Sequence, residues 1–248
     1  MKYTAITVSA VILLWELVLK GGYIPGLWDI ITTFFELLVN KDFLFNLWTS
    51  IWRLSLGWTI GMIIGTSIGV LMGTNYHARK LIMPLVSCLF PIPKIALLPL
   101  FVVLLGLGEA SKVTTIFIGA FFPSIITAYS SVLRTPTQYI EAGQVFGGNR
   151  WFVIRFIILP YNLPTIIQGF RTSGSLALTL LVAAEMLGAK YGLGHWIFLT
   201  GGEMAFAEMF AGIIWLSIIG LSINWGVEYI KSTVCKWSTL SEGTKDRL

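Results

Sequence analysis

Polar and charged side chains interrupt two apolar segments of this 248-residue chain, where they could contact a solute. The segment from 161 to 187 carries Gln168, Arg171, Thr172, Ser175, Thr179 and Glu185. At 100° per residue these positions fall within about 140° of a helix circumference, so one helix face is polar. Lys94 lies in an earlier, proline-rich apolar segment. Because a charge inside a bilayer is costly, Arg171 and Glu185 are expected to face protein or water.

Two interpretations of these residues stay open. The first places them along a translocation pathway, where the intramembrane cations Lys94 and Arg171 would suit an anionic solute. The second is structural: Arg171 pairs with Glu185 or with backbone oxygens and holds two copies of the chain together.

The composition indicates that these segments lie in a membrane. Hydrophobic residues make up 56% of the chain and charged residues 12%, whereas a soluble domain has about 25% charged residues. The net charge of +5 comes from Lys and Arg residues that fall mostly in short connections, where they orient a membrane protein. Nucleic-acid binding is therefore not expected.

The apolar segments predict an all-α integral membrane domain, 1–248, with six transmembrane helices. The predicted spans are 4–19, 47–73, 81–106, 113–133, 161–187 and 206–230. With both termini inside, ten Lys and Arg residues fall on the cytoplasmic side and five outside, which favours an N-in, C-in orientation. The apolar stretch 28–39 is too short to cross and is predicted to form a helix along the outer interface.

Glycine and proline patterns mark two of the predicted spans. The span 47–73 has a glycine at every fourth position: Gly57, Gly61, Gly65, Gly69 and Gly73. Such a ridge lets another helix approach closely. The span 81–106 contains Pro84, Pro91, Pro93 and Pro99. These prolines predict either non-helical backbone beside protein or a watery cavity, or a kinked packing helix.

The sequence offers no catalytic or metal-binding pattern. It has no G-x-x-x-x-G-K-[ST] phosphate loop, so ATP hydrolysis would need a separate chain. Its two cysteines match no metal spacing, and two histidines give poor support for an intramembrane enzyme. We therefore expect neither a cofactor nor a metal in this chain.

The longest predicted cytoplasmic connection, 134–160, contains an ordered motif. Its residues are Glu141, Ala142, Gly143, Gly147, Ile157, Leu159 and Pro160. Apart from Gly143 in place of alanine, their spacing matches E-A-A-x3-G-x9-I-x-L-P. This motif resembles the signature loop of ABC-importer permeases. The segments 90–112 and 182–194 also resemble the nitrate, sulfonate and taurine branch of that family.

The resemblance implies a type I ABC importer permease in the plasma (inner) membrane. Its expected partners are a second permease copy, two ATP-binding subunits that hold ATP and Mg, and an extracytoplasmic solute-binding protein. The expected solute is a small anion such as nitrate, a sulfonate, taurine or bicarbonate. The similar permeases for vitamin or pyrimidine-type precursors provide an alternative.

In such permeases this loop carries a coupling helix that docks on the ATP-binding subunit. Residues 139–146 could form it, with Gly147 and Gly148 ending the helix in left-handed geometry. Glu141 could bond to the partner, and Ala142 with Gly143 would provide a small docking face.

Other transport classes have weaker support in the sequence. A self-sufficient secondary transporter would also have polar intramembrane residues, but such proteins often show inverted repeats, and no clear repeat relates the two halves here. A channel would need a selectivity segment, and none is identifiable.

Overall fold

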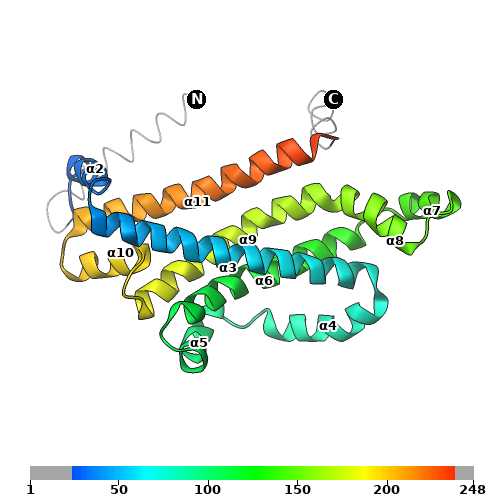
Figure 1. Cartoon of the computed structure of the whole chain (residues 1–248), viewed down its shortest axis with the longest axis horizontal. Helices are drawn as coiled ribbons and strands as arrows, with labels where there is room; N and C mark the ends of the chain where they lie inside the picture. The colour runs from blue at the N-terminus through cyan, green and yellow to red at the C-terminus, as the bar shows by residue number, and fades with distance from the viewer. Residues whose placement is uncertain (1–23, 238–248) are drawn as a thin grey trace. The chain divides into compact units, whose positions relative to one another are not determined.

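A computed structural model of the protein describes residues 24–237, and every regular element in that range is helical (Figure 1). The predicted span 4–19 lies outside the described residues. The chain divides into two compact units. Unit 1 contains the described residues up to Trp52 together with Val182–Ile219, and unit 2 contains Arg53–Leu181 together with the described residues from Gly220 onward.

Four described helical runs are long and apolar enough to cross a membrane. They are α3 (Lys41–Thr74), α6 (Glu109–Leu133), the run Arg150–Gly188 that includes α9 (Leu159–Gly188), and α11 (Phe206–Val234). The predicted spans 47–73, 113–133, 161–187 and 206–230 lie within these runs. The chain is therefore an all-helical membrane protein, as its composition indicates.

The proline-rich segment 81–106 is broken rather than continuous. Helix α4 (Tyr76–Leu89) is followed by the 3-10 turn η2 (Lys94–Leu97) and by α5 (Leu98–Leu105), and the two arms are bent by 90°. Pro91 and Pro93 lie in the break, and Pro99 lies in the first turn of α5, where a missing N–H is tolerated. The expectation of one span over 81–106 is thus corrected to a broken span or a re-entrant pair.

The glycine ridge of α3 lies against α6 within unit 2. A Cβ atom placed on Gly65 would lie 2.5 Å from the carbonyl oxygen of Phe121 and 2.9 Å from Cβ of Ser124. Gly57 and Gly73 face Ile116 and Val132 in the same way. The two backbones are therefore in contact, which glycine alone permits.

Unit 1 has an aromatic core of its own. Buried Leu37, Phe43 and Leu193 pack together, and the rings of Phe34 and Trp215 stack with centroids 4.8 Å apart. Phe34 belongs to α2 (Leu27–Glu36), the helix that the sequence predicts over 28–39. This core holds the N-terminal part of α3 against α10 (Leu193–Gly202).

Candidate functional site

The motif loop contains the helix that its sequence predicts. Helix α7 spans Thr137–Val145 and ends at Phe146. Gly147 has a φ of +79°, its N–H donates to the carbonyl of Gln144 at 2.9 Å, and the N–H of Gly148 donates to the carbonyl of Gly143 at 3.0 Å. This hydrogen-bond pair is a Schellman ending, in which Gly147 adopts the left-handed geometry at little cost.

Gly143, one residue of the expected docking face, faces the interior of the chain instead of a partner. Gly143 is buried, and a Cβ atom there would overlap the side chain of Ile157 in the same chain. The absent side chain therefore serves packing inside the loop, and the expectation that Gly143 contacts a partner is corrected. Glu141 and Ala142 are exposed.

Large apolar side chains extend the exposed surface of this loop. Phe146 is 89% exposed, Val145 is 84% exposed and Trp151 is 69% exposed. Exposed apolar groups of this size, gathered on one connection, are typical of a surface that another protein or a membrane covers. The sequence analysis missed them, although aromatic residues beside a motif glycine are visible in the sequence.

The rest of the motif faces the interior of unit 2. The four-residue helix α8 (Arg150–Val153) leads into a π-helical turn, Ile154–Ile158, and then into α9. Ile157 packs against the buried cluster of Val132, Val153 and Ile158, and Leu159 and Pro160 are half-buried. These motif residues hold the loop on the helices.

A buried amide completes this attachment. The Nδ2 group of Asn162 donates to Oγ1 of Thr135 at 2.7 Å and to the carbonyl of Ile158 at 2.8 Å. Its Oδ1 accepts a hydrogen bond from Ser131 at 2.8 Å. Asn162 thus ties the start of α9 to the end of α6. The motif loop leaves the helices and returns to them at this junction.

We expect the Asn162→Leu variant to weaken this junction. It removes three hydrogen bonds and leaves the Ser131 and Thr135 hydroxyls without that partner, which costs about 1–3 kcal/mol. The apparent melting temperature of the purified protein should fall, and the matched control Gln138→Leu, on the exposed part of α7, should leave it unchanged. Equal melting temperatures for the two variants would contradict a junction role.

The predicted polar face of α9 is exposed along part of its length. Thr172, Ser175 and Thr179 are exposed. The Ser175 hydroxyl donates to the carbonyl of Arg171 at 3.1 Å, and the Thr179 hydroxyl donates to that of Ser175 at 3.0 Å. Gln168 is half-buried. This face is thus exposed, but the protons of the Ser175 and Thr179 hydroxyls are already donated to backbone carbonyls.

Arg171 is half-buried beside this face, and its Nε donates to Oδ1 of Asn224 on α11 at 3.0 Å. Arg171 thus has this partner within unit 2, and Glu185, its expected partner, belongs to unit 1 and binds Ser50 and Gly194 there. Because an amide carries no charge, Asn224 leaves the positive charge of Arg171 uncompensated.

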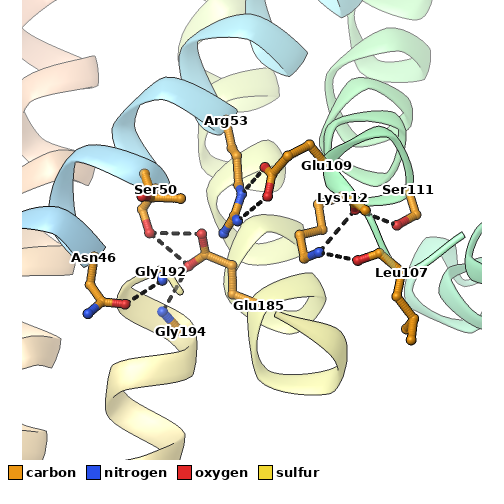
Figure 2. Close-up of polar contacts among 12 residues, drawn as sticks. Asn46, Ser50, Arg53, Leu107, Glu109, Ser111, Lys112, Glu185, Gly192 and Gly194 are labelled. Carbon is orange, nitrogen blue, oxygen red and sulfur yellow. Dashed lines mark hydrogen bonds and ion pairs between the residues drawn. The ribbon is translucent and has the colours of Figure 1, made fainter. Parts of the chain in front are cut away.

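Glu185 lies in a closed hydrogen-bond network of unit 1 (Figure 2). The side chain is 0% exposed, and its carboxylate accepts hydrogen bonds from Oγ of Ser50 at 2.8 Å and from the N–H of Gly194 at 2.9 Å. A carboxylate so enclosed cannot meet a passing solute. The expectation that Glu185 lines the pathway is therefore corrected to a structural role.

The same network holds the connection between α9 and α10 against α3. The N–H of Gly192 donates to Oδ1 of Asn46 at 2.6 Å, and the N–H of Leu193 donates to Oγ of Ser50 at 2.7 Å (Figure 2). The sequence analysis missed this network. Its visible signal is a pair of polar residues, Asn46 and Ser50, one helical turn apart in an apolar helix.

The sequence analysis also missed an ion pair in unit 2 between the buried Arg53 and Glu109, whose side chain is 52% exposed. The guanidinium of Arg53, 2% exposed, donates to both carboxylate oxygens of Glu109 at 2.6 Å. Lys112 is buried and donates to the carbonyls of Leu107 and Gly108 (Figure 2). Arg53 and Lys112 are two of the five Lys and Arg residues that the N-in, C-in orientation places outside, but both side chains are buried on helices, so neither acts as a loop charge.

Two of the predicted pathway residues, Lys94 and Thr179, line the same pocket. Both line a partly open pocket of about 380 Å³ in unit 2, at the break between α4 and α5. No group of three or more metal-ligating side chains occurs in the range 24–237. The available chemistry at this pocket is the binding of a solute by one ammonium group and an apolar wall.

These features define a polytopic membrane transport component with an exposed helical connection and a cation-bearing pocket. The family model of the "Binding-protein-dependent transport system inner membrane component" matches residues 59–234, and the chain belongs to this family. It is therefore a multi-pass inner-membrane permease of an ABC transporter and not an enzyme. Such a permease works with an ATPase and a binding protein, which replaces the secondary-transporter alternative.

Relatives of this chain include sulfonate, taurine and nitrate permeases, which form the branch of the family that its motifs resemble. It is 30% identical over 240 residues to the putative aliphatic sulfonates transport permease SsuC of Bacillus subtilis, covering 95% of this chain and 87% of the relative. It is 31% identical to the taurine permease TauC of Escherichia coli, covering 77% and 70%. It is 23% identical to the nitrate import permease NrtB of a Synechocystis species, covering 93% and 88%.

A solved structure supports the fold. A chain of the MetNI methionine ABC transporter, in an inward-facing conformation, matches with a TM-score of 0.65 and 22% identity. The match covers 84% of this chain and 97% of the other. The helical arrangement is thus that of an ABC permease.

Proposed function

We propose that two copies of this chain form the translocation pathway for a small anion in a type I importer, each with six spans and both termini in the cytoplasm. The observation that carries the proposal is the pair of uncompensated cations, Lys94 and Arg171, beside the exposed hydroxyl face of α9. In the described part of the chain neither cation has a carboxylate partner. Because unpaired charge at membrane depth is costly, these cations favour an anionic occupant.

The names of the relatives agree with this choice, since sulfonates, taurine and nitrate all carry a negative group. A vitamin or pyrimidine-type precursor is the alternative, and a neutral or cationic solute would leave Lys94 and Arg171 without a counter-charge. The solute would arrive on a binding protein, which selects it before the permease does.

The loop is proposed to receive the motion of the ATPase. Glu141 and Ala142 are exposed on α7, and Val145 and Phe146 extend that surface to the Schellman end at Gly147. Docking on a cleft of the ATPase would cover these side chains. ATP and Mg would be held by that subunit, with no cofactor in this chain.

The proposal is tested in proteoliposomes that contain this permease, its ATPase and its binding protein. We expect ATP-driven uptake of a small anion, and native mass spectrometry should show two permease copies with two ATPase subunits. Replacing Glu141 by alanine together with Gly147 by valine should abolish uptake, because the change removes a surface carboxylate and strains the helix end by about 1–2 kcal/mol. ATP hydrolysis should then persist without transport, or the ATPase should dissociate.

The double variant Glu203→Ala and Gly202→Val is a matched control, since both residues are exposed on the short α10 and its end. It should leave the association with the ATPase intact. Full uptake by the Glu141 and Gly147 double variant would contradict the coupling role. Uptake that needs neither ATP nor the binding protein would contradict the importer itself.

A further inference from the structure

The pocket at the break between α4 and α5 has an apolar wall. Phe90, Ile95, Pro123, Leu176 and Leu180 contribute to it, from the break, α6 and α9. Its volume of about 380 Å³ lies near the lower end of the range of about 300–1,000 Å³ for small-molecule sites. A pocket of this size and lining can enclose a compact apolar group.

Lys94 is the cation of this pocket. Its Nζ lies 4.5 Å from the ring centroid of Phe90 and 5.7 Å from that of Phe122, and it donates to the carbonyl of Phe90. The aromatic rings and the carbonyl hold the ammonium in place without neutralising it. An ammonium has three donors, so it retains the capacity to bind an anion.

The other polar side chain on the wall does not compete for this role. The Thr179 hydroxyl donates its proton to the carbonyl of Ser175 at 3.0 Å. It therefore presents its methyl group and oxygen lone pairs, which do not attract an anion. Recognition of negative charge at this pocket rests on Lys94.

We propose that this pocket is a selectivity subsite for organic anions that carry one negative head and a compact apolar body. The inference rests on the proposed function and narrows it, because the headgroup would meet Lys94 while the body would contact Ile95, Leu176 and Leu180. An inorganic anion such as nitrate has no apolar body and would leave most of the wall uncovered. The permease thus adds its own discrimination to that of the binding protein.

The test is a calorimetric titration of the purified permease and ATPase complex, without binding protein, using methanesulfonate, ethanesulfonate, butanesulfonate, nitrate and 1-butanol. Each methylene of the sulfonate should raise affinity by up to about fourfold, because it is buried against the wall. Butanesulfonate should therefore bind at least about tenfold more tightly than nitrate or 1-butanol.

Variants at two pocket positions, Lys94 and Ile95, test the binding of the charged headgroup and of the apolar body separately. Lys94→Gln should lower butanesulfonate affinity by about tenfold or more without affecting 1-butanol, and Lys94→Arg should restore most of the loss. Ile95→Trp enlarges a side chain that is exposed at the rim, so it should weaken butanesulfonate more than methanesulfonate. Lys41→Gln, which removes an exposed charge in unit 1, is the control and should change neither affinity.

Affinity that does not depend on chain length, or that is equal in the wild type and in Lys94→Gln, would overturn the inference. Displacement of a co-purified lipid as the sole effect of butanesulfonate, seen by native mass spectrometry, would overturn it too. Either result could occur in a complex that still performs ATP-driven anion uptake, and the proposed function would then stand. Absence of ATP-driven uptake for every anion would instead remove the proposed function.

Discussion

Replacing Gly192 by alanine should prevent the permease from folding into a stable complex. Gly192 has a φ of +129°, and an added Cβ would lie 2.6 Å from Oε2 of Glu185 and overlap other carboxyl atoms of that side chain. Backbone strain costs about 1–3 kcal/mol, and forcing atoms into a packed site costs about 1–3 kcal/mol more. The buried carboxylate has no room to move, because Ser50 and Gly194 hold it.

The measurement is the yield of monodisperse protein after detergent extraction, together with its apparent melting temperature. Gly202→Ala is the matched control, since Gly202 lies in α10 with no atom near the position of an added Cβ. We expect the control to behave as the wild type. A Gly192→Ala protein of normal yield and melting temperature would show that the network around Glu185 tolerates displacement.

Replacing Gly65 by valine should separate α3 from α6 and lower the stability of the permease. The added Cβ would lie 2.5 Å from the carbonyl oxygen of Phe121, which belongs to a helix backbone and cannot rotate away. The added methyl groups would increase the overlap. The expected cost is about 1–3 kcal/mol, which corresponds to a fall in the apparent melting temperature of about 2–12 °C for a chain of this length.

Gly226→Val provides the comparison, because Gly226 is exposed on α11 and nothing lies within 4 Å of its added Cβ. Thermal unfolding of both variants in the same detergent gives the difference directly. Equal melting temperatures would mean that α3 and α6 can move apart at low cost. The glycine ridge would then be a sliding contact rather than a fixed one.

Features that depend on neighbouring residues were predictable from the sequence. The end of α7 at Gly147 follows from the left-handed geometry that glycine accepts. The break between α4 and α5 is one of the two outcomes that the prolines indicated, because Pro91 and Pro93 cannot donate backbone hydrogen bonds. The long apolar helices follow from segment length and composition. Each of these rules acts within a few residues or one segment, so no partner segment needs to be known.

Features that depend on distant partners were not predictable. The polar arc on α9 includes Glu185 by periodicity, but Ser50 and Gly194 enclose its carboxylate. Arg53 falls inside the predicted span 47–73, and the sequence does not show that Glu109 on another helix pairs with it. The sequence predicts Gly143 as part of a docking face, but in the structure the side chain of Ile157 covers it.

The sequence by itself therefore determined the class of the protein, four of its long apolar helices, its family motif and the position of the helix that is proposed to meet the ATPase. The tertiary structure decided which polar residues are buried and which are open to a solute. Glu185 is fully buried, whereas Lys94 and Thr179 line a partly open pocket. The physical reason is that helix periodicity defines a face, whereas burial depends on which other helix covers that face.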